Sequence, residues 1–387
     1  MLLHRVRIIG SEPLKDIRIW NGKIQEIASA GSLTDDAETR LVLDEALVFS
    51  GLINSHDHLD FNLFPRLGNR IYNNYREWGK DIHTTNSAGI ASVLRIPRAL
   101  RVRWGIYKNL LNGITTVVNH GKLLSIPDPL ITVHQGSRCL HSPAFEKNWK
   151  LKINAPHTGR RPFAMHLGEG TDELSRREID SLIRWNIFKR KVVAIHGVAM
   201  NPEQAAAFHA LVWCPASNYF LLNKTAAVNE LGRQVNIMLG TDSTLTASWN
   251  LWEHLRMARK EKMVPDRELL DMLTLIPAKV WGLNDCGRIA EGCRADLVVA
   301  AGKKATDPIQ HFFSLNPEDL LLLVHHGHIR MFDASLLARI DGPGFDIGRF
   351  SKILVNGRLK YVEGDLPGLM NRIAEYYPAV RFPVSLS

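Results

Sequence analysis

The chain has 387 residues, which is enough for one large domain and one smaller domain. It is 45% hydrophobic and 22% charged, the composition of an ordinary globular protein, and no apolar run reaches the ~18 residues needed to span a membrane. The formal charge of +9 comes from scattered basic residues without the pattern of a nucleic-acid-binding module, so we expect no nucleic-acid partner.

The N-terminal stretch MLLHRVRIIGSEP lacks the long apolar centre and the small-residue cleavage site of a secretory signal. The four cysteines form no C-x-x-C pair, which argues against a disulfide framework and against a structural zinc knuckle. We therefore expect a cytoplasmic protein with reduced thiols.

Both ends of the chain have β character. The runs RVRIIG, IRIWNGKIQEI and TRLVL predict small antiparallel strands before residue 46, and FSKILVNGRLKYVEGDL predicts a hairpin that turns at Asn356-Gly357. The segment NPEDLLLLVHHG predicts a helix capped by Asn316. These patterns predict a small β-sandwich domain composed of residues 1–49 and 284–387.

The central residues, 50–283, alternate apolar runs with helix-length stretches. Strands of a parallel sheet are buried on both faces, so their sequences are nearly continuous apolar runs. Eight runs fit this description: ALVFSGLINSH, GITTVVNH, ITVHQ, LKINAPH, PFAMHLGE, VVAIHG, LVWCPASN and VNIMLGTDS. The pattern predicts an α/β fold, a (β/α)8 TIM-like barrel. Only TGRR separates the fourth run from the fifth, which is too short for a crossover helix, so either a helix is trimmed or one run is misassigned.

His56 and His58 stand one residue apart at the end of the first run. Side chains two apart on a strand point to the same face, so these imidazoles converge while Asp57 points away. Two imidazoles placed in this way can bind one metal ion.

Three later runs end in side chains that could also bind a metal ion or transfer a proton, at the same end of the predicted barrel. His166 ends the fifth run, His196 ends the sixth and Asp242 follows the eighth, and function in a barrel lies at the C-terminal ends of its strands. Glu169 follows His166 by three residues, where a carboxylate could take a proton from a metal-activated water and deliver it to a leaving group. The alternative for each residue alone is a strand-end or helix-capping role.

The motifs GLINSHDH, GITTVVNH, HLGEG, AIHG, CPASN and GTDS, with GRIAEGCRADLVV after the barrel, resemble the amidohydrolase superfamily. Within it, the chain is similar to the branch of cytosine, guanine and S-adenosylhomocysteine deaminases and triazine hydrolases. The resemblance covers essentially the whole chain and is least distinctive between about residues 121 and 160 and over the last hundred residues.

The resemblance implies one divalent metal ion held by His56, His58, His166 and Asp242. It also implies that Glu169 is the acid/base, that His196 orients the attacking hydroxide and polarises the substrate, and that Asp242 accepts a proton as well as binding metal. Zinc is the expected ion, with iron or manganese as alternatives.

Several residues are expected on the substrate side of the pocket. The resemblance implies Ser217 and Asn218, and a histidine after the fourth strand, which is His157 with His141 as its rival. Other family members hold two metals bridged by a carboxylated lysine at the end of the fourth strand, but Lys152 precedes that end, so we predict a mononuclear site. His120 and His134 are expected to be structural. The aromatic segment after His58 could wall the pocket, and its candidates are Phe61, Arg66, Tyr72 and Trp78.

The expected activity is hydrolytic deamination of an amino-substituted heterocycle, such as a nucleobase-, nucleoside- or triazine-like molecule, by a metal-activated hydroxide. The alternative keeps the same residues but hydrolyses a cyclic amide, a carbon-halogen bond or an N-acyl compound, and a non-catalytic scaffold is a further alternative. The expected partner is a small-molecule substrate, and the chain could also form a homo-oligomer.

Overall fold

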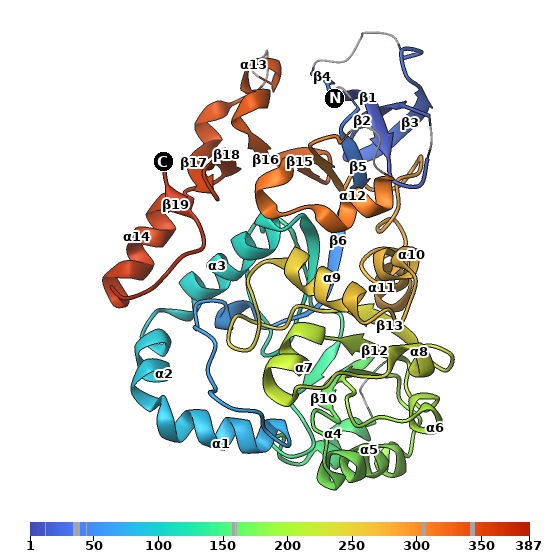
Figure 1. The fold of residues 1–387 in the computed structure, drawn as a ribbon, viewed down its shortest axis with the longest axis vertical. Helices are drawn as coiled ribbons and strands as arrows, with labels where there is room; N and C mark the ends of the chain where they lie inside the picture. The colour runs from blue at the N-terminus through green and yellow to red at the C-terminus, as the bar shows by residue number, and fades with distance from the viewer. Residues whose placement is uncertain are drawn as a thin grey trace.

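The computed structural model describes residues 1–11, 13–33, 39–43, 45–156, 159, 161–303, 307–340 and 345–387. Strands from the two ends of the chain lie together, at the top of Figure 1, and the central residues form most of the rest of the molecule. The architecture is α/β, with one mostly antiparallel sheet and two parallel sheets.

The terminal segments share one sheet of 11 strands in the order β19-β17-β18-β16-β15-β14-β5-β1-β2-β3, with β4 paired to β1. Its strands are β1 (Leu2–Ile8), β2 (Lys15–Trp20), β3 (Lys23–Ser29), β4 (Arg40–Val42), β5 (Leu47–Ser50), β14 (Leu297–Ala300), β15 (Leu320–His325), β16 (His328–Asp333), β17 (Phe350–Val355), β18 (Arg358–Glu363) and β19 (Ser385–Leu386). The domain boundaries stay a prediction, but the sheet joins the two chain ends through the antiparallel pair β5 and β14.

Details of this sheet differ from the expectation in two places. β4 runs parallel to β1, not antiparallel. The segment after Asn316 is not a helix: a short 3-10 turn, Pro317–Asp319, leads into β15, whose apolar run is buried between β14 and β16. The hairpin of β17 and β18 is confirmed, with Asn356 at φ 46° and Gly357 at φ 78°, the left-handed pair that a tight two-residue turn requires.

Eight strands of the central segment form two parallel sheets, β6-β7-β8 and β13-β12-β11-β10-β9. They are β6 (Leu52–Asp57), β7 (Ile114–Asn119), β8 (Thr132–His134), β9 (Arg138–Leu140), β10 (Phe163–Leu167), β11 (Val192–His196), β12 (Ala210–Trp213) and β13 (Asn236–Leu239). Strands β10 and β11 are buried at every position, as their mostly apolar sequences predict. The two sheets approach at one seam, where the Asp242 N–H donates to the His56 carbonyl at 3.0 Å.

The fourth strand is not the expected LKINAPH run. Residues Trp149–Ile153 form the short helix α4, and the fourth parallel strand is β9, which pairs with β10. The crossover between β9 and β10 therefore contains a helix, and the spacing conflict disappears. Residues Ala155 and Pro156 follow α4 and are not a strand end.

Helices lie between and around these strands (Figure 1). They are α1 (Tyr75–Thr85), α2 (Ser87–Leu94), α3 (Arg98–Leu111), α4, α5 (Glu173–Trp185), α6 (Pro202–Ala205), α7 (Pro215–Leu222), α8 (Val228–Leu231), α9 (Leu251–Lys260), α10 (Asp266–Asp271), α11 (Leu275–Trp281), α12 (Pro308–Ser314), α13 (Leu337–Ile340) and α14 (Leu366–Tyr376). None of the described helices is long and apolar enough to cross a membrane.

Candidate metal centre

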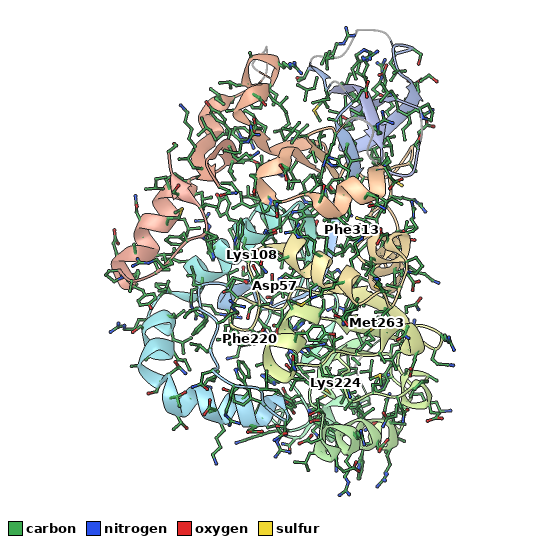
Figure 2. The ribbon with its side chains drawn as sticks, in the orientation of Figure 1. Asp57, Lys108, Phe220, Lys224, Met263 and Phe313 are labelled. Atoms are coloured by element: carbon green, nitrogen blue, oxygen red, sulfur yellow. The ribbon has the colours of Figure 1, made fainter. Side chains whose placement is uncertain are left out.

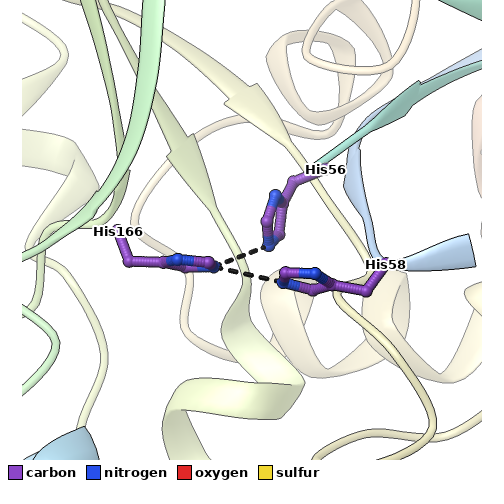
Figure 3. Close-up of side chains that lie close together, drawn as sticks. All are labelled: His56, His58 and His166. Carbon is purple, nitrogen blue, oxygen red and sulfur yellow. Dashed lines mark hydrogen bonds between the residues drawn. The ribbon is translucent and has the colours of Figure 1, made fainter. Parts of the chain in front are cut away.

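Four donor atoms from three strand ends converge on one point. The Nε2 atom of His166 lies 3.3 Å from Nε2 of His56 and 3.2 Å from Nε2 of His58. Oδ1 of Asp242 lies 3.6 Å and 3.7 Å from the same two histidine nitrogens. Figure 3 shows the three imidazoles meeting at their tips.

This spacing fits a bound cation. Ligand atoms placed tetrahedrally at about 2.0–2.1 Å from a zinc ion are about 3.4 Å apart, close to the distances in this cluster. The Nδ1 atom of His166 lies 2.8 Å from the His141 carbonyl oxygen, which can only accept, so Nδ1 carries the proton and Nε2 keeps its lone pair. His56, His58, His166 and Asp242 could therefore hold a divalent metal ion.

The protonation states of the cluster suit a dication as well. Burial lowers the pKa of His58 to about 4 and that of His166 well below its usual range, so both imidazoles are neutral near pH 7. Burial alone would raise the pKa of Asp242, but a hydrogen bond to His56 and the charges of the surrounding histidines hold it well below its usual range. Neutral imidazoles and an ionised carboxylate are the forms that bind metals.

The alternation of β6 places these side chains as expected. His56 and His58 face the cluster, while Asp57 points to the opposite side and accepts from Asn62 Nδ2 at 2.8 Å and Asn109 Nδ2 at 2.7 Å. Asp57 also forms an ion pair with Lys108 of α3, whose Nζ lies 3.0 Å from Oδ2 of Asp57. Asp57 and Lys108 are labelled near the middle of Figure 2. Asp57 is therefore part of the support of the site.

Glu169 and His196 lie beside the four donors. Oε2 of Glu169 is 3.6 Å from Nε2 of His196. Burial, followed by the charges of Asp242 and Glu178, raises the pKa of Glu169 well above its usual range, which suits a carboxyl group that both accepts and donates a proton. His196 and Asp242 have φ values of 74° and 56°, a left-handed conformation that residues other than glycine rarely adopt and that is concentrated at functional sites.

Ser217 and Asn218 lie in the first turn of α7 and are fully buried. Oγ of Ser217 donates to Oδ2 of Asp242 at 2.8 Å, and Thr246 Oγ1 donates to the same oxygen at 2.9 Å. Oδ1 of Asn218 lies 2.8 Å from Nδ1 of His196, so it accepts the imidazole proton. Neither Ser217 nor Asn218 lines the adjoining cavity. Their side chains contact Asp242 and His196 instead of the space where a substrate would bind. No sequence signal identified Thr246.

A cavity of about 690 Å³ opens onto the cluster. Its walls include Phe61 and Trp78, as the sequence suggested, but not Arg66 or Tyr72. The remaining apolar and aromatic lining consists of Tyr75, Ile82, Phe145 and Leu245, and the polar lining near the cluster consists of His58, His141, His166, Glu169, His196, Asp242, Ser243 and Thr246. This size and mostly apolar wall suit a small organic molecule.

The two candidate histidines after the fourth strand have different outcomes. His141 directly follows β9 and lines the cavity. His157 lies outside the described residues, and the run that placed it at a strand end is a helix. His120, at the end of β7, is buried, its ring centroid lies 4.4 Å from that of His166, and neither ring nitrogen has a hydrogen-bond partner among the described residues.

Comparisons with known proteins agree with this geometry. Residues 154–329 match the Amidohydrolase family. A 5-methylthioadenosine/S-adenosylhomocysteine deaminase from Caldicellulosiruptor saccharolyticus is 24% identical over 84% of this chain and 91% of its own length. An adenosine deaminase from Xanthomonas campestris with bound zinc has the same fold, with a TM-score of 0.68 at 15% identity over 97% of each chain.

An atrazine chlorohydrolase from Arthrobacter aurescens, complexed with zinc, aligns with a TM-score of 0.66 at 18% identity over 96% of this chain and 99% of its own. The family match covers β10 to β13 and Asp242, and the structural matches extend the common fold to nearly the whole chain. The chain therefore contains an amidohydrolase-family domain.

Proposed function

We propose that the chain is a metal-dependent hydrolase that removes an exocyclic amino group from a heterocycle by hydrolytic deamination. The observation that carries this proposal is that the nitrogens of His56 and His58 each lie 3.2–3.7 Å from both His166 Nε2 and Asp242 Oδ1, next to the Glu169 and His196 pair. The names of the sequence relatives, which are deaminases, support the same reaction.

A divalent ion held by these four residues would supply Lewis acidity, which lets a water molecule lose its proton near neutral pH. Glu169 takes one proton from that water and delivers it to the ring nitrogen beside the reacting carbon. A carbon-oxygen bond forms, the carbon-nitrogen bond breaks, and the second water proton leaves with the amino group as ammonia. A buried Glu169 with a raised pKa suits both halves of this transfer.

His196 and Asp242 act on the same water and on the substrate heteroatom. Asn218 accepts the Nδ1 proton of His196, so the lone pair of the neutral ring lies at Nε2, on the side of Glu169. Ser217 and Thr246 hold Oδ2 of Asp242, which leaves Oδ1 for the cluster. We therefore assign Ser217 and Asn218 a positioning role in place of the expected contact with substrate.

We propose one zinc ion per chain. Three imidazoles and one carboxylate suit zinc, and two of the structural relatives hold zinc. Lys152 lies on the surface of α4 in an ion pair with Glu146, and the fourth strand ends at Leu140 followed by His141, so no lysine among the described residues stands where a bridging carbamate would need it.

The substrate is a small heteroaromatic amine. The aromatic side chains of Phe61, Tyr75, Trp78 and Phe145 offer flat walls for a ring, and the relatives act, by their names, on adenosine compounds, while one neighbour is a triazine chlorohydrolase. We also infer that the two parallel sheets close into a (β/α)8 barrel, because the Asp242 N–H, in the segment that follows β13, donates to the His56 carbonyl of β6.

The test is ammonia release by zinc-loaded and iron-loaded protein across aminopyrimidines, aminopurines, adenosyl compounds, pterins and aminotriazines. Release from one class supports deamination and identifies the substrate class. If the protein with one bound metal ion releases no ammonia from any compound of the panel but hydrolyses a cyclic amide or a chlorotriazine, the alternative hydrolysis replaces deamination.

A further inference from the structure

Helix α1, at the lower left of Figure 1, forms one wall of the cavity and presents basic side chains to it. The lining that comes from this helix includes Arg76, Lys80 and His83. These positions are four and three residues apart, so they share one face of the helix and follow its axis for about 10 Å. The proposed deamination does not use any of the three.

The acidic side chains of α1 are bound on other sides of the helix. Oε1 of Glu77 lies 2.6 Å from a guanidinium nitrogen of Arg70, and Oε2 of Glu77 accepts the Asn73 N–H at 3.1 Å. Oδ2 of Asp81 accepts the Tyr72 hydroxyl at 2.7 Å. Neither Glu77 nor Asp81 lines the cavity. The helix therefore turns its basic side to the cavity and its acidic side away from it.

Arg76 and Lys80 have no carboxylate that neutralises them inside the cavity. The only carboxylates among the described residues of the lining are Glu169 and Asp242, which belong to the metal cluster. The Arg76 charge opposes the burial that raises the pKa of Glu178 to about 7, but no ion pair between described residues joins these two side chains. The wall formed by α1 thus offers two positive charges to whatever occupies the cavity.

The position of this basic face is fixed relative to the reaction centre. The Tyr75 N–H, in the first turn of α1, donates to the Glu169 carbonyl at 3.0 Å. Arg76 is the next residue along the chain, and Lys80 stands about 6 Å further along the helix axis. A ring that reacts beside Glu169 therefore has both cations within the length of a short substituent.

We propose that Arg76 and Lys80 form a specificity site for an anionic group of the substrate, a carboxylate or a phosphate, attached to the ring that loses its amino group. This inference rests on the proposed function and narrows its substrate class to heteroaromatic amines with an anionic substituent. Arginine and lysine form charge-assisted hydrogen bonds to such oxygens. The cavity of about 690 Å³ has room for a substituent beside the ring.

The test is direct binding, measured by calorimetry on the zinc-loaded Glu169→Gln variant so that turnover stays low. The probes are matched pairs built on adenine, cytosine and an aminotriazine. One member of each pair carries a carboxyethyl or phosphonoethyl group, and the other carries an ethyl group. We expect the charged member of at least one pair to bind at least tenfold more tightly, the effect of a hydrogen bond to a charged group. The better of the two anions identifies the group that the site takes.

Arg76→Met and Lys80→Met, made in the same background, remove one charge each and keep most of the side-chain length. Each should lower the preference for the charged probe roughly fivefold and leave the affinity of the neutral probe unchanged, and Lys80→Glu should lower the preference further. Both side chains are exposed, so the variants should fold, which thermal unfolding checks. Arg177→Met is the control, because Arg177 pairs with Glu173 on the exposed face of α5.

Three results would overturn the proposal: equal affinity of both members in every pair, no binding of any charged probe, or an unchanged preference in the variant that lacks both cations. The last result would show that the anion binds elsewhere, such as at the metal ion. Ammonia release plays no part in this measurement. A preference without ammonia release in the panel keeps the anionic site and removes deamination, whereas ammonia release without a preference does the opposite.

Discussion

Nζ of Lys108 lies 3.0 Å from Oδ2 of Asp57, and both side chains are almost completely buried between the strands that carry the candidate site. Asp57 is the residue between His56 and His58, so the same strand presents two imidazoles to one side and a paired carboxylate to the other. Lys108 also donates to Thr241 Oγ1 at 3.0 Å, next to Asp242 in the chain. The ion pair therefore fixes the two backbone segments that bring the donor atoms together.

Removing one partner of this buried pair should be strongly destabilising. Lys108→Met leaves the Asp57 carboxylate without its cation, and we expect the free energy of unfolding to fall by about 3–5 kcal/mol in urea titrations. Arg177→Met is the control, because Arg177 pairs with Glu173 on the exposed face of α5 and should change stability little. Equal stability of the two variants would show that the pair contributes nothing specific.

Metal binding should depend on the four donors and not on histidines in general. His58→Gln removes one nitrogen of the cluster, and we expect the zinc affinity to fall by more than the roughly 10- to 100-fold attributed to losing an outer partner of a ligand. Equilibrium dialysis with metal analysis measures this. His134→Gln is the matched variant, since His134 packs against Trp281 with ring centroids 5.5 Å apart, and it should retain zinc.

Glu169→Gln keeps the shape of the side chain and removes its proton-transfer ability. We expect zinc content to be unchanged and turnover to fall by roughly 100-fold or more. Glu173→Gln, an exposed glutamate at the start of α5, is the control and should retain full activity. Undiminished turnover in Glu169→Gln would remove this residue from the reaction.

Asn218→Ala tests the orientation of His196. Without the acceptor at 2.8 Å from Nδ1, the ring can rotate or change tautomer, and we expect kcat to fall roughly 10- to 100-fold with a smaller change in KM. Asn218→Asp retains an acceptor oxygen and should preserve more of kcat. A change confined to KM would instead favour direct contact of Asn218 with substrate.

Stability should decline in acid partly through His254, a fully buried imidazole in α9. Burial lowers its pKa from 6.5 to about 4. Between these two values the unfolded chain binds a proton that the folded chain does not, so stability falls as the pH falls, by at most about 1.4 kcal/mol per pH unit. Urea unfolding should show a shallower pH dependence for His254→Gln than for the wild type over this window, and an equally steep one would remove His254 as the cause.

The sequence was most informative where an apolar run leads directly to a polar residue. The apolar runs of β10, β11 and β13 predict strands that the structure confirms, and His166, His196 and Asp242 lie at or just beyond their ends. Strand β9 was missed because its three residues, RCL, carry no pattern of their own and pair only because β10 lies beside them. The apolar run of β15 was assigned to a helix for a related reason, since a short apolar run looks the same in either structure.

The sequence by itself determined which donors the chain offers, because the period of two in a strand separates His56 and His58 from Asp57, and strand ends carry His166, His196, Glu169 and Asp242. Only the tertiary structure decided which of them meet and what supports them. The 3.2–3.7 Å spacing, the bonds of Ser217 to Asp242 and Asn218 to His196, and the cavity wall all join segments far apart in the chain. Such contacts follow from strand register and crossover packing, which no local pattern encodes.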